Sequence, residues 1–224
     1  GWKAQIEAAE RLTRMGALDP NQLFGLYTEE RASASGGVWD RVTVISDLDT
    51  ALSAGRASRV AQLLPAAWDT MQEQELEPAF AAMFADRLVA LDLPDEAGRI
   101  AFRLSLLTPG FEAAAAARQP ADLDEKLLAA VARGATAGTP AQDQLGLMLK
   151  RVFDGPAGAV PEPYRALVPD RLGEALLAAI DDISEGAKGD YRRLENGMGM
   201  LRAAGLESLA RRVGLELVVL ERRG

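Results

Sequence analysis

Residues 88–107 read LVALDLPDEAGRIAFRLSLL, and this stretch decides the fold. Its apolar residues fall at three- and four-residue steps, as in Ile100, Leu104 and Leu107. Such spacing is typical of the buried face of an amphipathic α-helix. Pro94 precedes that stripe, and proline is favoured where a helix begins. The stretch therefore predicts a helix end, a tight turn and a second helix.

The same pattern returns near the end of the sequence, where residues 201–220 read LRAAGLESLARRVGLELVVL. Aligned without gaps, the two stretches are identical at seven of twenty positions, and Leu104 is matched by Leu217. A single helical hairpin cannot bury both of its apolar faces, so repeated hairpins stack on one another. We interpret the match as a hairpin unit used more than once. The alternative is chance similarity between two Ala- and Leu-rich helices.

The composition favours helices throughout the chain of 224 residues. The sequence has 41 Ala and 32 Leu but only 17 Val and Ile together, and Ala and Leu are strong helix formers. Segments 41–45 and 216–220 look locally strand-like, but both lie inside helical patterns and are assigned to helices. Further stripes, each interpreted as one buried helix face, are Val38/Val42/Ile45/Leu52, Val60/Leu63/Leu64/Ala67/Met71, Phe80/Phe84/Leu88, Leu123/Leu127/Val131, Leu145/Leu149/Val152, Leu172/Leu176/Ile180/Ile183, Tyr191/Leu194/Met198/Leu201 and Leu209/Val213/Leu217/Leu220.

We therefore predict an all-α fold of about eleven helices, arranged as an array of antiparallel helical hairpins, in the form of a short α-solenoid or an irregular orthogonal bundle. The motifs Asp19-Pro20-Asn21-Gln22 and Thr139-Pro140-Ala141-Gln142 are expected to begin helices as capping boxes. Pro65 is expected to kink or split its helix. Segments 32–37, 109–119 and 154–163 are expected to be loops or short turns.

The repeated hairpin resembles the tetratricopeptide-like superfamily of helical repeats over roughly two-thirds of the chain. The resemblance implies right-handed stacks of hairpins that bind proteins or peptides. The Trp-x-x-Leu-Gly-x-x-Tyr signature and the fixed 34-residue period of that family are absent here. No binding residue can therefore be carried over to this sequence.

The chain is expected to form a single repeat-like domain over residues 1–224. It begins with Gly1 rather than Met, which suggests a processed or truncated part of a longer chain. Removal of a signal peptide and trimming of the chain would both leave such a start. We favour the periplasm over the cytoplasm. The many arginines, 21 against 4 lysines, with abundant Ala and Gly suggest a bacterial genome rich in GC.

Composition excludes several kinds of site. The sequence contains no cysteine and no histidine, which removes disulfides, thiolate nucleophiles, imidazole bases and the usual zinc ligands. Its formal charge of −8 opposes binding to nucleic acid, which needs clustered Lys and Arg. The longest strictly apolar run, Ala79 to Ala85, has seven residues, whereas a transmembrane helix needs about 18 or more. We expect no nucleic-acid partner and no transmembrane segment.

Carboxylates are the remaining candidates for catalysis or metal binding. The sequence holds three acidic clusters, namely Asp47/Asp49, Asp122/Asp124/Glu125 and Asp181/Asp182. Each is interpreted as solvated helix charge. Glu29-Glu30-Arg31-Ala32-Ser33 lacks the Glu-Ser pair of lytic transglycosylases, so a catalytic role there is rejected. We predict no catalytic residue, no cofactor-binding residue, no metal ligand and no cofactor.

Other unusual residues have structural interpretations. Gly197-Met198-Gly199 lacks the preceding strand of a nucleotide site and is expected to permit close helix contact. Trp68, Tyr27 and Tyr164 are assigned to the core, whereas Trp39 borders the core or stands on an exposed concave face. The C-terminal arginines are explained by the helix dipole and by solubility; they are Arg211, Arg212, Arg222 and Arg223.

The favoured function is a non-catalytic interaction module that binds a protein or peptide partner. The alternatives are a helical domain that binds a lipid or peptidoglycan fragment, and an accessory domain of a larger cell-envelope enzyme. An interaction module should present an exposed groove, whereas a ligand-binding domain should enclose an apolar pocket of at least about 300 Å³.

Overall fold

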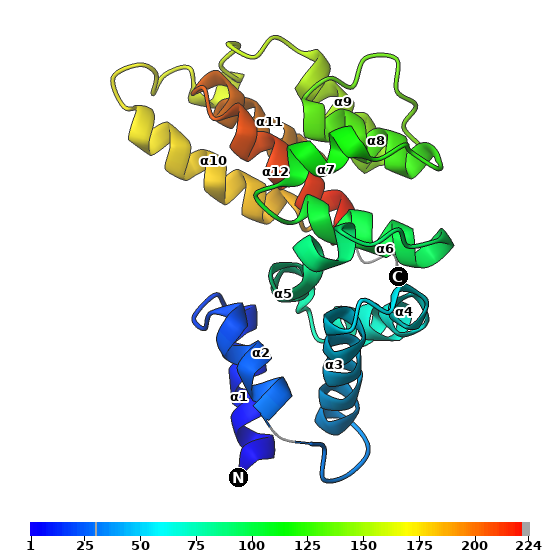
Figure 1. The fold of residues 1–224 in the computed structure, drawn as a ribbon. Helices are drawn as coiled ribbons and strands as arrows, with labels where there is room; N and C mark the ends of the chain where they lie inside the picture. Colours follow the sequence, from blue (N-terminus) through cyan, green and yellow to red (C-terminus); the bar gives the residue numbers. More distant parts are fainter. Residues whose placement is uncertain (30, 221–224) are drawn as a thin grey trace. The chain divides into compact units, whose positions relative to one another are not determined.

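A computed structural model of the protein describes residues 1–29 and 31–220, and in that part of the chain every regular element is a helix (Figure 1). The all-α prediction is confirmed. The chain divides into two compact units, Gly1–Gly110 and Phe111–Gly224. The single repeat-like domain stays a prediction, because units of this size also occur as halves of one domain.

The described residues of unit 1, 1–29 and 31–110, form six helices around an apolar core. The largest core side chains include Tyr27, Phe80 and Phe84, all nearly inaccessible to water. Phe84 packs edge-on against Phe80 and Phe24. The helices are α1 (Trp2–Arg14), α2 (Pro20–Glu29), α3 (Val38–Ser53), α4 (Ala57–Glu73), α5 (Glu77–Val89) and α6 (Asp95–Leu106).

Unit 2 contains six further α-helices and one short 3₁₀ turn among its described residues. Its core is formed by apolar residues of α8, α9, α11 and α12, including Leu128, Met148, Leu194 and Leu215. The elements are α7 (Phe111–Ala117), α8 (Leu123–Arg133), α9 (Gln144–Asp154), η1 (Glu162–Tyr164), α10 (Leu172–Gly186), α11 (Tyr191–Ala203) and α12 (Glu207–Val219).

One turn joins consecutive helices three times. After α3, α4 and α11 the backbone takes a left-handed conformation, at Gly55, Glu75 and Gly205. The next residue donates its N–H to the carbonyl five positions earlier, as Leu206 does to Leu201 at 2.9 Å. This is the Schellman geometry that ends many helices. In all three cases the next helix begins at the residue after that donor. The connection between α5 and α6, within residues 88–107, has a different geometry, because Ala90 after α5 is right-handed.

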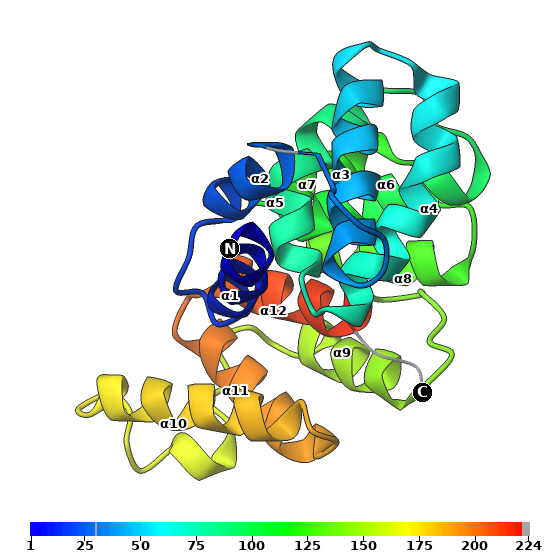
Figure 2. The same cartoon turned by 90° about the horizontal axis from the view of Figure 1, so that it is seen from below.

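Helices α10 and α11 form the closest pair in unit 2, lying side by side in Figures 1 and 2. A Cβ atom at Gly197 would lie 2.6 Å from the carbonyl oxygen of Ala179 and 2.7 Å from Ile183, and one at Gly186 would lie 2.6 Å from the Leu194 nitrogen. The contacts pair the end of α10 with the start of α11, so these helices are antiparallel. The expectation that Gly197 permits close helix contact is confirmed.

Two boundary predictions are wrong. Segment 109–119 contains α7, whose sequence FEAAAAA carries too few large apolar residues to show helical spacing. This element makes twelve α-helices in the described chain rather than about eleven. Helix α9 begins at Gln144 rather than at Pro140, because the side chain of Asp143 accepts a hydrogen bond from the Gly146 N–H at 2.7 Å and caps it there.

The other boundary predictions largely hold. Asp19 accepts a hydrogen bond from the Asn21 N–H at 2.8 Å, where α2 begins. The exception is Pro65, which was expected to kink or split its helix: the split is wrong, because α4 continues through Pro65 as one helix. Segments 32–37 and 154–163 are largely irregular, and the strand-like segments 41–45 and 216–220 lie in α3 and along α12 as predicted.

Two apolar stripes do not lie in the core, in contrast to the prediction. On α10 the buried residues are Ala175, Ala179 and Gly186, because only small side chains fit against α11. Leu172 is therefore 40% exposed and Ile180 is 54% exposed. The stripe of α12 is only half-buried, and Leu209 at its start is 43% exposed. On α8, Leu123 is also exposed, at 40%.

Candidate functional site

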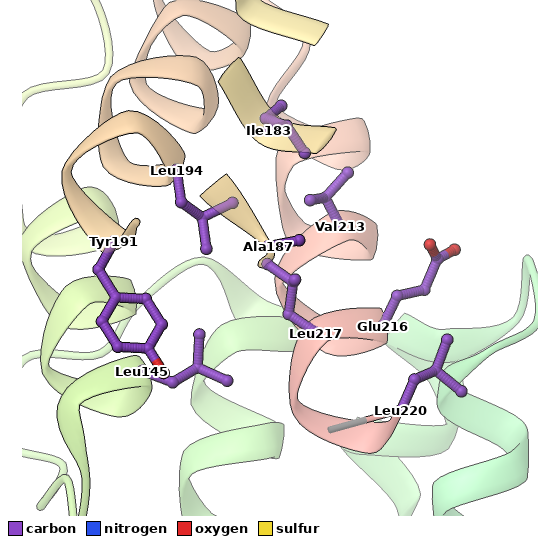
Figure 3. Close-up of a pocket in the computed structure, with 9 residues that line it drawn as sticks. All are labelled: Leu145, Ile183, Ala187, Tyr191, Leu194, Val213, Glu216, Leu217 and Leu220. Atoms are coloured by element: carbon purple, nitrogen blue, oxygen red, sulfur yellow. The ribbon is translucent and has the colours of Figure 1, made fainter. Parts of the chain in front are cut away.

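The strongest candidate site is an open apolar groove in unit 2, which we call the α12 groove. Four helices line a cavity of about 540 Å³ (Figure 3). This volume lies in the range typical of binding sites. The wall residues are Leu145 of α9, Ile183 of α10, Tyr191 and Leu194 of α11, Val213, Glu216 and Leu217 of α12, and Ala187 and Leu220 just beyond the ends of α10 and α12.

Helix α12 contributes a continuous face to this groove. Its groove residues are Val213, Glu216, Leu217 and Leu220, which recur at steps of three, one and three. On an α-helix these positions lie on one side over two turns. Between helices in a core, such a face would normally pack against another helix. Here it stays half-buried.

Glu216 is the one ionisable side chain among the groove residues of α12. Its side chain has no hydrogen bond or ion pair to any residue in the described part of the chain. Burial raises the pKa of the Glu216 carboxyl, and the positive charge of Arg212, one helical turn away, lowers it by less. A carboxylate in an apolar wall is costly unless a cation or a hydrogen-bond donor meets it.

The sequence-matched face of α6 provides a contrast. Ile100 corresponds to Val213 and Leu104 to Leu217, yet in unit 1 these residues are only 5% and 0% exposed. Helix α4 packs against α6 there, and its Trp68 lines the same cleft as Ile100. Ile100 borders that open cleft, but it and Leu104 are almost closed to water beside α4, whereas Val213 and Leu217 line the groove and stay half-buried.

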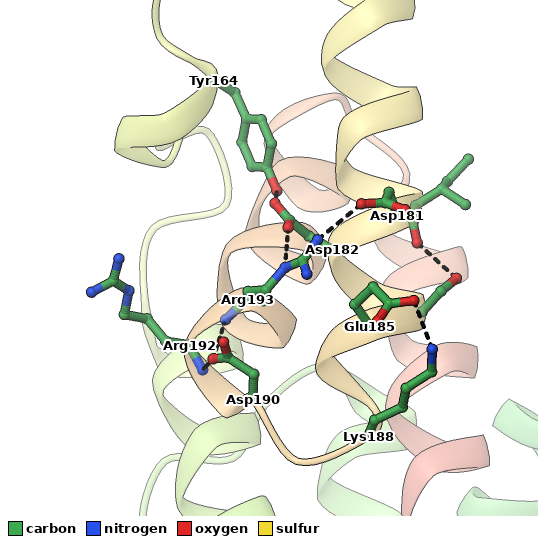
Figure 4. A network of polar contacts seen from close by, with 10 residues as sticks. Tyr164, Asp181, Asp182, Glu185, Lys188, Asp190, Arg192 and Arg193 are labelled. Carbon is green, nitrogen blue, oxygen red and sulfur yellow. Dashed lines mark hydrogen bonds and ion pairs between the residues drawn. The ribbon is translucent and has the colours of Figure 1, made fainter.

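A polar cluster lies on the other side of the α10–α11 pair (Figure 4). The hydroxyl of Tyr164 donates a hydrogen bond to Asp182 at 2.6 Å, and the Arg193 guanidinium donates to the same carboxylate at 2.6 Å and to Asp181 at 2.9 Å. Burial and the hydrogen bond to Asp182 raise the pKa of Tyr164. The cluster ties η1, α10 and α11 together and keeps Tyr164 protonated.

Unit 1 contains the same three kinds of group in a sealed setting. Tyr27 donates to Glu10 at 2.7 Å, and Arg41 donates to both carboxylate oxygens of Glu10 at 2.7 Å. The pKa of Tyr27 is raised mainly by burial and then by the negative charge of Glu10 and the hydrogen bond to it. All three side chains are buried, so this cluster joins α1, α2 and α3 and offers no access to a substrate.

The acidic clusters considered from the sequence are largely engaged by arginines, not simply solvated. Asp49 pairs with Arg87 at 2.7 Å, whereas Asp47 is exposed. Asp122 caps α8, and buried Glu125 pairs with Arg118 at 2.8 Å. Within residues 1–29 and 31–220, no three His, Cys, Asp or Glu side chains are grouped closely enough to hold a metal ion.

The aromatic predictions are borne out. Trp68, Tyr27 and Tyr164 belong to the core, at 6%, 0% and 1% exposure. Trp39 is half-buried. Its ring lies at a tilt against that of Trp2, with 5.3 Å between ring centroids, and both residues line a second open cavity in unit 1.

The remaining basic and acidic sequence candidates have local roles or lie outside the described chain. Arg211 pairs with Glu112 at 2.8 Å and donates to the Ala132 carbonyl. Arg222, Arg223 and Glu30 lie outside the described residues.

The groove residues were not singled out from the sequence. Val213, Leu217 and Leu220 were assigned to a buried face, and Glu216 was noted only within a strand-like segment. The available signal was Glu216 itself, since it interrupts an apolar stripe at a position that faces inward.

No helix of the described chain is both long and apolar enough to cross a membrane. Comparison with protein-family models, with curated proteins and with solved structures finds no match to this chain.

Proposed function

We propose that this protein is a non-catalytic interaction module that binds an apolar segment of a protein partner in the α12 groove. The observation that supports the proposal is the open face of α12, which presents Val213, Leu217 and Leu220 to a cavity of about 540 Å³. An apolar groove rimmed by helices is a recurring site for peptide segments. The absence of His and Cys from the sequence supports a role without catalysis.

A peptide selection tests the proposal. A displayed library of random peptides is selected on the immobilised protein, and the selected peptides are then measured against two variants. Leu217→Asp places a charge in the groove. Leu177→Asp places the same charge on the exposed side of α10, where the leucine is 70% exposed, and serves as the matched control.

Peptides that bind the wild type and Leu177→Asp with equal affinity, and lose at least tenfold with Leu217→Asp, would support the proposal. If every selected peptide binds Leu217→Asp as well as the wild type, the groove is not the binding site and the proposal is overturned.

The second candidate is a small amphiphile, such as a lipid or a peptidoglycan fragment. The volume of the groove favours it, since about 300–1,000 Å³ is typical of ligand sites. The open form of the groove favours a peptide instead. A fluorescent fatty acid, used below its critical micelle concentration, distinguishes the two candidates. Saturable binding of the fatty acid that is lost in Leu217→Asp would support the amphiphile, provided that no peptide shows binding that depends on Leu217.

A further inference from the structure

The matched faces of α6 and α12 indicate what kind of segment the groove accepts. In unit 1, the face with Ile100 and Leu104 is buried against neighbouring elements that include α4. In unit 2, the face with Val213 and Leu217 lines the groove. Residues at equivalent places in two copies of one sequence pattern have the same spacing, so they can accept the same type of neighbour.

Helix α10 does not fill the place that α4 fills in unit 1. Both helices come directly before the matched hairpin in chain order. Gly186 and Gly197 let α10 lie tightly on α11, whereas α4 packs against α6. Ile183 of α10 forms a wall of the groove. The groove therefore has helical walls and an open place where unit 1 has a helix.

One charged position differs in sign between the matched faces, whereas Arg99 and Arg212 match each other. Glu216 in the groove aligns with Arg103 of α6. Arg103 lines the cleft between α4 and α6 together with Asp69 of α4. Helix α4 therefore presents a carboxylate to the cleft that the matched arginine lines. A helix that packs on the same face of α12 would meet the carboxylate of Glu216 at the position where α4 faces Arg103.

We propose that the α12 groove accepts a helix of a partner protein whose apolar face carries one Lys or Arg directed at Glu216. The inference rests on the proposed function and adds the conformation and the charge of the bound segment. Val213, Leu217 and Leu220 bury the apolar face of that helix, and its cation replaces the water lost by the Glu216 carboxylate. Opposite charges at such a contact select the partner and fix its register.

Model peptides test this inference. Three peptides of about fourteen residues share Ala and Gln as helix-forming background and a Leu stripe at steps of three and four. The three peptides differ at one position of the Leu stripe, which holds Lys, Gln or Glu. Further sets of three place this variable residue at each of the other stripe positions. Affinities are measured by titration against the wild type, Glu216→Gln and Glu216→Arg, and helicity is followed by circular dichroism.

The wild type should bind the best Lys peptide about tenfold more tightly than its Glu counterpart. With Glu216→Gln the difference in affinity between the Lys and Glu peptides should become smaller. With Glu216→Arg, which has the charge of Arg103, the Glu peptide should bind more tightly than the Lys peptide. Bound peptides should gain helical signal. If peptides bind through Leu217 with an affinity that does not depend on their charge, or without gaining helical signal, this inference is overturned and the proposed function is not. If no peptide of the panel binds through Leu217, the inference fails; the library selection then decides the proposed function separately.

Discussion

Residues 88–107 of unit 1 and 201–220 of unit 2 have matching sequences, and each unit holds a cluster of a tyrosine, a carboxylate and an arginine, but the matched leucine and the carboxylate are less exposed to water in unit 1. Leu104 is fully buried, whereas the matched Leu217 lines an open groove. Glu10 is 3% exposed in its cluster, whereas the side chain of Asp182 is 20% exposed. An apolar stripe defines which face of a helix can be buried, and the neighbouring helix decides whether it is.

The sealed polar cluster should show the largest difference between the units. Glu10→Gln leaves the Arg41 charge buried without its carboxylate, so we expect a loss of about 3–5 kcal/mol in the free energy of unfolding. Asp182→Asn should cost much less, because water and salt already screen the Asp182–Arg193 pair. Urea unfolding followed by circular dichroism measures both. Equal losses would contradict the contrast between a sealed and an open cluster.

The matched leucines give the next largest effect. Leu104→Ala should lower the free energy of unfolding by about 2–5 kcal/mol, because it leaves a cavity in the core of unit 1. Leu217→Ala should cost clearly less, since water reaches Leu217 in the groove. The same urea measurement compares them. A larger loss for Leu217 would mean that the α12 face is covered in the free protein.

The close α10–α11 contact should respond to one methyl group. Gly197→Ala places a Cβ 2.6 Å from the Ala179 carbonyl oxygen, and such overpacking costs about 1–3 kcal/mol. Gly25 is the control, because it is also helical but exposed, and a Cβ there meets no atom within 4 Å. Gly25→Ala should instead stabilise by about 0.5–1 kcal/mol. Thermal unfolding of the two variants should therefore shift in opposite directions.

The smallest expected effect concerns the pH dependence of the groove. The pKa of Glu216 is raised from its ordinary value of 4.5 by burial, so the folded state holds this proton more tightly than the unfolded state. Stability gained in this way is present at low pH and is lost as the pH rises through the folded-state pKa. Glu216→Gln should therefore raise the urea midpoint at pH 7 but not below pH 4. The opposite sign at pH 7 would show that the carboxylate has a cationic partner in the free protein.

The sequence predicted helices well because their signals are local. In the stripe Val60, Leu63, Leu64, Ala67 and Met71, four residues lie in the core at 0% exposure as expected, and Leu63 is half-buried. The Ala-rich α7 was missed for a physical reason: five consecutive alanines have high helix propensity but no contrast between faces. At α9, an Asp close to the first apolar residue proved a better cap than the Thr-Pro motif four residues earlier.

The candidate site was not predicted, because facing depends on neighbours that are distant in the sequence. The stripe of α12 looks like that of α6 in the sequence, and the alignment of Leu104 with Leu217 gives no sign of their different burial. The antiparallel array and the tetratricopeptide-like resemblance stay predictions for the chain as a whole, with α10 and α11 as one described antiparallel pair.

The order of apolar and turn-forming residues by itself determined an all-helical protein and most of the places where its helices begin and end, because these properties depend on residues within a few positions of one another. Only the tertiary structure decided that α10 buries its alanines and exposes its leucines, and that α12 keeps an open face around Glu216. Burial is a property of pairs of surfaces, and the partner of each surface comes from another part of the chain.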